Sequence, residues 1–416
     1  MIKYRGAISM QMKYLQLHKL LSNFAQELVG AFIPLILYQE TKNLPLAISY
    51  YVLLRFVLLL TDLIFKKKYQ AKPQLFLLLR IIPMLLYYIF ILLIDVNVWV
   101  ACVGILIFSG ISESFKFIPT DTVYNYNSLN SGSSTLGFTK VIERLGVVGA
   151  QVMGALFLDN LPKWLLIVVS LVIYLISTLP LFISYLKSKG SATFNVEGIS
   201  NAQAQWKQNH NDEKLKKGKE ITKKTFILYG ISFMLFCMAD LNTSLFGLFL
   251  YVKVDKYSIV GILSVIYYAV QIPFNSLVGK IDQKKDLLPY VVVSSVATGL
   301  FTFIIGIFMM VPFTDTLLII SMVLFAIMGA MYPFVTIFYF DRMLLKSKIL
   351  GKSNEMIVVR EFTGIGAQLI SALPGLGGSF VAMFLFMGAA FIIGGATLPM
   401  VEEKTRKYLV NYLQNN

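Results

Sequence analysis

The sequence predicts an all-α polytopic membrane protein with twelve transmembrane helices in two six-helix bundles. Three observations predict this fold class. Hydrophobic residues make up 57% of the 416 residues and charged residues only 14%, whereas soluble domains carry about 25% charged residues. Apolar runs of about 20 residues, the length that crosses a bilayer as a helix, recur from end to end. Segments of the first half also recur in the second half at a constant offset, which indicates a duplicated unit.

The apolar runs define the individual helices. The expected helices cover residues 17–38, 46–65, 74–94, 97–117, 137–159, 162–186, 225–250, 257–279, 287–311, 316–339, 356–374 and 379–401. Very short turns join the third helix to the fourth, at Asp95–Asn97, and the fifth to the sixth, at Asp159–Lys163. The first run is too long for a signal-peptide core and lacks a small-residue cleavage site, so we expect it to be retained.

Basic residues concentrate on one side of these helices. With the N-terminus inside, the cytoplasmic segments hold 27 of the 37 Lys and Arg residues, and the outside loops hold four. This asymmetry follows the positive-inside rule, so we expect a multi-pass protein of the plasma membrane with both termini in the cytoplasm. Adding or removing one helix would destroy the alternation, which supports the number twelve.

The chain divides into three expected parts. These are an N-terminal six-helix bundle at residues 1–186, a cytoplasmic linker at 187–224 and a C-terminal six-helix bundle at 225–416. The linker is polar and carries six lysines between Lys214 and Lys224. Its simplest interpretation is a solvated spacer that helps to set the topology, and the alternative is a regulatory or lipid-headgroup role.

Short segments of the two halves match at an offset of 217 residues. The matched residues are Gly149, Ala150 and Gln151 with Gly366, Ala367 and Gln368, and Asn23, Gly30 and Phe32 with Asp240, Gly247 and Phe249. A charged pair precedes each Gly-Ala-Gln segment, in inverted order in the two halves. Parallel halves of this kind pack around an axis along the membrane normal and enclose a substrate site near the midplane.

With six plus six helices, a charged central loop and both ends inside, the chain resembles the major facilitator superfamily. The loop signature of that family survives in part, as Gly279 and Asp282 between helices eight and nine, and as Asp62 before the Lys66–Lys68 run. The resemblance implies that Asp62, Gly279 and Asp282 belong to a cytoplasmic gate. It also implies that helices one, four, seven and ten line the cavity.

The fifth helix is similar to the antiporter motif of the same family. Its glycines include Gly146, Gly149 and Gly154, and Gln151 stands where the family has proline. Small residues at this spacing allow two helices to approach closely, so helix packing is one interpretation and export by a drug/proton antiporter is the other. Gln368 is the equivalent residue in the second half.

Polar residues inside the membrane are functional candidates because charged side chains are costly there. Helical spacing places Asn23, Gln26, Glu27 and Gly30 on one face of the first helix. We expect proton coupling at Glu27, Asp240 and Glu113. The expected substrate cavity consists of Asn23, Gln26, Ser112, Lys116, Thr243, Ser244, Tyr332, Thr336 and Tyr339.

Six further charged residues form an expected charge network. They are Arg55, Arg80, Glu143, Arg144, Arg360 and Glu361. Adjacent helical residues point about 100° apart, so we expect the members of each Glu/Arg pair to bind other helices instead of each other. The network serves either structure or coupling.

Several classes are not expected. The two cysteines lie in apolar runs, the two histidines have no partner typical of catalysis, and no metal-ligand spacing or Walker-type phosphate loop occurs. We therefore expect no enzyme, no cofactor, no metal site and no ATP motor. The net charge of +15 follows the topology pattern and does not indicate nucleic acid.

The sequence thus predicts a monomeric secondary active transporter that works by alternating access and contacts membrane lipids. We expect proton-coupled export of an amphipathic or drug-like molecule. One alternative is a proton symporter or uniporter that imports a small polar solute. A second alternative is a transporter-like receptor or partner protein without transport, with the 187–224 loop as its docking surface.

Overall fold

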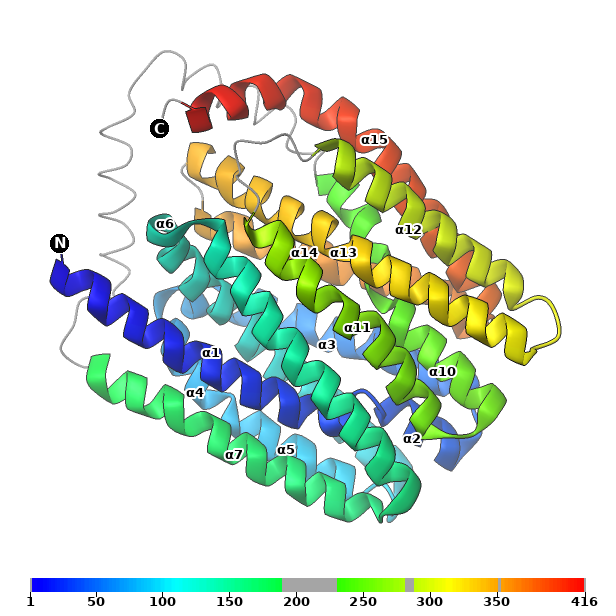
Figure 1. Ribbon diagram of the computed structural model, residues 1–416. Helices are drawn as coiled ribbons and strands as arrows, with labels where there is room; N and C mark the ends of the chain where they lie inside the picture. The colour runs from blue at the N-terminus through cyan, green and yellow to red at the C-terminus, as the bar shows by residue number, and fades with distance from the viewer. Residues whose placement is uncertain (1, 189–229, 281–287, 351–352, 415–416) are drawn as a thin grey trace.

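The computed structural model describes residues 2–188, 230–280, 288–350 and 353–414. The described chain is helical throughout apart from short connections (Figure 1). Eleven helices of these ranges are long and apolar enough to cross a membrane. Large apolar side chains such as Ile64, Val96 and Met400 are exposed on the outside, as expected of surfaces that face lipid.

The N-terminal bundle contains the first six spans. Its helices are α1 (Ile2–Gly30), α2 (Ile33–Thr41), α3 (Leu44–Ala71), α4 (Pro73–Leu79), α5 (Ile81–Leu92), α6 (Val98–Asn160) and α7 (Lys163–Ser188). The α6 segment includes both the fourth span, Val98–Val123, and the fifth, Lys140–Asn160. Helical residues therefore continue through the connection that the sequence predicts between 117 and 137.

The C-terminal bundle contains the remaining spans. Its elements are residues 230–237, η2 (Met238–Leu241), α10 (Asn242–Val254), α11 (Tyr257–Lys280), α12 (Leu288–Phe308), α13 (Asp315–Leu350), α14 (Ser353–Ala372), η3 (Leu373–Gly377) and α15 (Phe380–Gln414). The eleventh predicted helix corresponds to α14. This helix is not among the eleven apolar spans, because Arg360, Glu361 and other polar residues interrupt it.

Three spans are interrupted by short breaks. The first breaks after Gly30, four residues before Pro34, and the third breaks at Arg80, three residues before Pro83. Proline removes one backbone hydrogen bond and clashes with the preceding turn, which explains both breaks. The seventh span changes to a 3₁₀ turn at Met238–Leu241, a kind of interruption that often marks a hinge.

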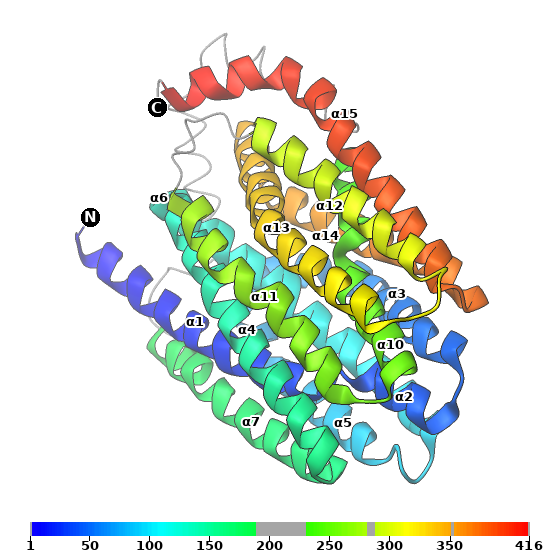
Figure 2. The same ribbon diagram turned by 45° about the vertical axis from the view of Figure 1, so that its right-hand side comes forward.

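The two bundles meet along two pairs of helices. In Figure 1, α11 runs beside α6 and α14 runs beside α3, and the contacts of the chain confirm both neighbours. Glycine allows a close approach at the first seam, because a Cβ on Gly261 would lie only 2.7 Å from the Cβ of Ala155. The start of α1 and the end of α15 lie on one side (Figure 2), here called the terminal side, and the opposite side is called the far side.

Candidate functional site

A cavity of about 350 Å³ lies between the two bundles. The N-terminal bundle lines it with Lys19, Asn23, Arg55, Leu58, Lys116, Phe117, Thr120, Asp121, Lys140 and Glu143. The C-terminal bundle lines it with Phe233, Phe236, Cys237, Tyr332, Thr336, Ile337, Arg360, Glu361, Gly364, Ile365 and Gln368. Lys140 begins its span and Ile337 ends its span on the terminal side, so the cavity lies in the terminal half of the molecule.

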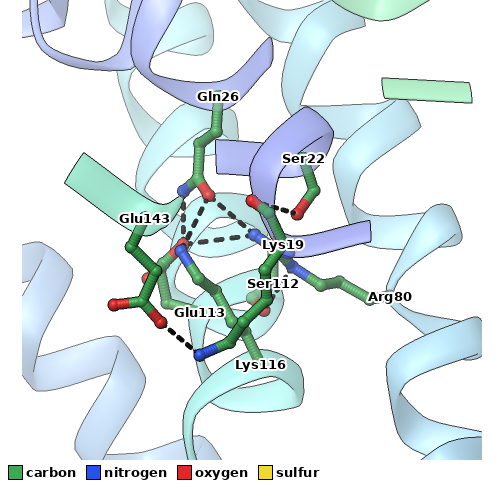
Figure 3. A network of polar contacts seen from close by, with 8 residues as sticks. All are labelled: Lys19, Ser22, Gln26, Arg80, Ser112, Glu113, Lys116 and Glu143. Atoms are coloured by element: carbon green, nitrogen blue, oxygen red, sulfur yellow. Dashed lines mark hydrogen bonds and ion pairs between the residues drawn. The ribbon is translucent and has the colours of Figure 1, made fainter. Parts of the chain in front are cut away.

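A buried polar network supports the N-terminal wall of this cavity (Figure 3). The fully buried Arg80, at the break between α4 and α5, donates from Nε to the Ser112 carbonyl (3.2 Å) and to Ser112 Oγ (3.0 Å). Its Nη2 donates to Gln26 Oε1 at 2.7 Å and lies 3.4 Å from Glu113 Oε1.

Glu113 is held by three neighbours. Gln26 donates to it, Arg80 forms an ion pair with it, and Lys116 Nζ lies 3.7 Å from its Oε1. Lys116 also donates to Gln26 Oε1 at 3.3 Å. Two cations therefore flank this one carboxylate, which leaves the group of three with one net positive charge.

A second ion cluster lies closer to the terminal side. Glu143 pairs with Lys19 of α1 and, at 2.8 Å, with Lys140. Figure 3 shows Glu143 and Lys19 bonded beside the Gln26–Glu113–Lys116 group. Two lysines share one carboxylate here, which leaves this part of the wall positive.

Glu27 has a different environment. It accepts a hydrogen bond from Gln151 Nε2 at 2.9 Å, and no basic side chain of the described ranges forms an ion pair with it. Gln151 Oε1 is buried and has no hydrogen-bond partner among the described residues. Glu27 lies one helical turn after Asn23, which lines the cavity, and so shares its face of α1.

The C-terminal wall of the cavity contains a group of three aromatic residues. Phe236 stacks on Tyr332 with ring centres 5.9 Å apart, and Phe233 lies 6.3 Å from Phe236. Arg360 and Glu361 are its two charged residues. They form an ion pair with each other at 2.5 Å.

The bundles touch on the terminal side of the cavity. Arg360 of α14 pairs with Asp121 of α6. Lys66 Nζ of α3 lies 5.7 Å from the centre of the Phe362 ring. Deeper along the seam, the Arg144 guanidinium of α6 lies 4.7 Å from the Tyr268 ring of α11, a cation–π contact between the bundles.

Different contacts close the far side. The Asp159 carboxylate of α6 accepts hydrogen bonds from the backbone N–H groups of Tyr257 (3.0 Å) and Ser258 (2.9 Å) at the start of α11. The Tyr257 hydroxyl donates to Gln39 Oε1 of α2 at 2.6 Å. A carboxylate at a helix N-terminus is favourable because the N–H groups there lack partners within the helix.

The structure brings together many of the predicted residues. Asn23, Lys116, Tyr332, Thr336, Arg55, Glu143, Arg360, Glu361 and Gln368 line the cavity. Gln26, Ser112, Arg80 and Glu113 lie behind its wall, in the buried network. Glu143 and Arg144 contact other helices, as expected. The same expectation is wrong for Arg360, because its long guanidinium reaches Glu361 as well as Asp121.

Other predicted residues lie elsewhere. Thr243 is buried in α10 and Ser244 is exposed, and neither lines this cavity. Asp62 is buried and accepts from Ser114 Oγ at 2.5 Å, within its own bundle. The side chains of Asp240 and Tyr339, and the gate candidates Gly279 and Asp282, lie outside the residues whose surroundings are described.

The glycines of the fifth span pack against α1. A Cβ on Gly146 would lie 3.0 Å from the Leu20 carbonyl oxygen, and one on Gly154 would overlap the Leu28 carbonyl oxygen. The small residues thus allow α1 and α6 to approach until Gln151 reaches Glu27.

Four residues of the site were not predicted from the sequence. Lys19, Asp121 and Lys140 lie near the ends of expected helices, where charge is ordinary, and Asp159 lies in an expected turn. The short Asp159–Lys163 connection could have predicted the role of Asp159. An acidic residue in a tight turn can accept hydrogen bonds from the N-terminus of a helix that packs beside it.

The chain was compared with known proteins. No family model and no curated protein sequence matches it. Its structure is similar to that of a bacterial homologue of the iron transporter ferroportin in an outward-facing state (TM-score 0.65, 13% identity, covering 98% of this chain and 100% of that one). It is also similar to the human organic anion transporter MFSD10 (0.60, 10%, 94% and 99%). A third similar structure is a POT family transporter in complex with a thioalcohol-conjugated peptide (0.63, 13%, 95% and 96%).

These similarities cover nearly the whole length of each chain. They show that the chain has the major facilitator fold, with two six-helix bundles. Among the described residues, no group of three or more His, Cys, Asp or Glu side chains could hold a metal ion.

Proposed function

We propose that this chain is a proton-coupled secondary transporter that moves an amphipathic small molecule by alternating access. The observation that carries the proposal is the cavity between the bundles, with separate contacts on its terminal and far sides. Because each set contains few polar contacts, the bundles can part on one side and stay together on the other. The bacterial ferroportin homologue of this fold is known in both outward-facing and inward-facing states.

Glu27 is the proposed proton carrier. Its one hydrogen bond comes from Gln151, whose Oε1 has no partner among the described residues. The amide of Gln151 can serve both protonation states of Glu27, because its NH₂ donates to a carboxylate and its oxygen accepts from a carboxylic acid. Protonation of Glu27 thus gives the buried Gln151 Oε1 a hydrogen-bond donor that it lacks when Glu27 is ionised.

The other two proton candidates differ from Glu27. Arg80 and Lys116 already balance the charge of Glu113, so we assign it to the structure of the wall. Asp240, whose side chain is not described, stays a prediction, and its place in the 3₁₀ turn of the seventh span makes it worth testing.

The remaining features are proposed on the sequence evidence. The 27-to-4 distribution of basic residues supports a plasma-membrane protein with cytoplasmic termini. The expected domains, 1–186, 187–224 and 225–416, and the monomeric state also stay predictions. Export was expected from the glycines of the fifth span, but their packing against α1 accounts for them without reference to direction.

Flux into proteoliposomes tests the proposal. The probes are three amphipathic fluorescent dyes of negative, zero and positive charge, each assayed with and without a pH gradient. We expect at least one dye to accumulate with the gradient, and the sign of the gradient that drives it distinguishes symport from antiport. Glu27→Gln should lose gradient-driven accumulation and keep dye exchange.

The matched control is Glu40→Gln, which removes a carboxylate that pairs with Lys163 on the far side. We expect this variant to transport normally. The absence of flux for all three dyes would contradict transport and favour the receptor alternative. Gradient-driven accumulation that survives in Glu27→Gln would contradict the proton assignment.

A further inference from the structure

The two walls of the cavity differ in charge. The N-terminal wall carries four basic residues, Lys19, Arg55, Lys116 and Lys140, against two acidic ones, Asp121 and Glu143. The C-terminal wall carries one of each sign, and they pair with each other. Among the described residues that line the cavity, the excess of positive charge therefore lies on the N-terminal wall.

The residues behind the wall do not cancel this excess. Arg80 and Glu113 neutralise each other. Glu27 is the remaining acid of that layer. With Arg144 of α6 included, these described residues give the N-terminal side a surplus of two positive charges when Glu27 is ionised, and of three when Glu27 carries a proton.

The opposite wall offers an apolar surface. Phe236 and Tyr332 stack there, and Phe233 extends the surface. A molecule that touches both walls at once needs an anionic end and an aromatic or apolar body. The volume of about 350 Å³ is within the range of small-molecule sites.

We propose that the substrate is an amphipathic organic anion that is transported together with a proton, in the same direction. Its anionic group binds at Lys116, its apolar part lies against Phe236 and Tyr332, and the proton binds to Glu27. This inference rests on the proposed transport function and replaces the expected antiport with symport.

Proton binding and anion binding are coupled because the ionised Glu27 and the substrate anion compete for the same basic side chains. The charged and titratable groups near Glu27 are Glu113, Lys116 and Arg144 from α6 and Tyr87 from α5. An ionised Glu27 attracts Lys116 and lowers the positive potential that the substrate meets, whereas a protonated Glu27 leaves that potential intact. Proton and anion therefore strengthen the binding of each other, and this linkage is reciprocal.

Equilibrium binding to the purified full chain tests the charge preference. The probes are tritiated naphthylacetate, naphthylacetamide and naphthylethylammonium, which share one ring system and differ in charge. We expect the carboxylate to bind about tenfold tighter than the amide, or more, and the ammonium to bind weakest. Lys116→Gln should bind carboxylate and amide equally, and Lys116→Arg should restore the preference.

Two further variants serve as a control and as a substitute for Lys116→Gln. Lys163→Gln, on the far side, should preserve the preference of the native chain. If Lys116→Gln does not fold, Lys140→Gln at the rim of the cavity should reduce the preference, since it removes one of the four basic residues. Tighter binding of the amide or the ammonium, or no binding of any probe, would overturn the proposal.

The pH dependence of carboxylate binding tests the proton. Affinity should rise as the pH falls, with a slope of up to about tenfold per pH unit for one coupled proton. Glu27→Gln should bind tightly at every pH, because it mimics the protonated state. His18→Gln is the control at another buried titratable residue of α1, and it should keep the native slope.

A slope that survives in Glu27→Gln and disappears in His18→Gln would overturn the coupling. Binding also separates this inference from the proposed function. A chain that selects the carboxylate but shows no flux would retain the anion site and contradict transport. A chain that transports the neutral or cationic dye and rejects the anion would retain transport and contradict the anion site.

Discussion

The two walls of the central cavity are built on different physical principles. The N-terminal wall is supported by a network of charged residues. In this network, Arg80, Lys116 and Glu113 contact one another and Gln26. The C-terminal wall is a stack of aromatic rings around Phe236. Charged side chains attract the charged end of a ligand over a long range, whereas aromatic rings bind a ligand only in direct contact. In the proposed transporter, one bundle supplies selectivity for charge and the other supplies affinity for an apolar body.

The largest expected effect comes from breaking the charged wall at its centre. Arg80→Met would leave Glu113 buried with one cation fewer, because the fully buried guanidinium contacts Glu113, Gln26 and Ser112. We expect the free energy of unfolding to fall by about 3–5 kcal/mol. Unfolding in detergent, followed by circular dichroism, measures this change.

The control for that prediction is a pair on the surface. Lys163→Met removes partners of Glu40 and Asp95 on the far side and should change the free energy of unfolding by about 1 kcal/mol or less. Equal effects of the two substitutions would mean that Arg80 does not hold the wall together.

A moderate effect is expected from the aromatic wall. Phe236→Leu keeps an apolar side chain and removes the ring that stacks on Tyr332. We expect the affinity for naphthylacetate to fall about three- to tenfold, while the preference for carboxylate over amide stays unchanged. Equilibrium binding of the three naphthyl probes measures both quantities, and a changed charge preference would break the division of roles between the walls.

An effect of similar size is expected at the contact that joins the two bundles on the far side. Asp159→Ala removes the cap of α11, worth about 0.5–2 kcal/mol, which corresponds to a shift of about 2- to 30-fold toward molecules open on the far side. Asn160→Ala, which removes a hydrogen bond within α6 only, is the matched control. Double electron–electron resonance between labels at Leu161 and Lys256 reports the populations, and equal shifts in both variants would exclude a specific role for Asp159.

Much of this fold follows from local sequence features. Apolar runs and alternating basic loops predict the spans and their short turns, because hydrocarbon admits only backbone that satisfies its own hydrogen bonds. The breaks near Pro34 and Pro83 also have a visible cause. The turn at Met238–Leu241 contains no proline, so the sequence offers no comparable signal for this break.

The site is predictable only in part. Helical periodicity finds the polar face of α1 and the residues of α6 from Ser112 to Lys116, because both depend on spacing within one helix. It does not find the Asp121–Arg360 pair or the cap of α11 by Asp159, because these depend on how the two bundles meet. Contacts between the two bundles do not depend on any repeating spacing in the sequence, so periodicity cannot predict them.

Alternating exposure of the central cavity is the claim on which the account depends. The direct test is the distance between spin labels at Leu161→Cys and Lys256→Cys on the far side, in a chain whose Cys102 and Cys237 are replaced by alanine. In liposomes, we expect one population at the closed distance and a second, longer one, whose ratio changes when naphthylacetate and a pH gradient are applied. A single closed distance under all of these conditions would contradict the account.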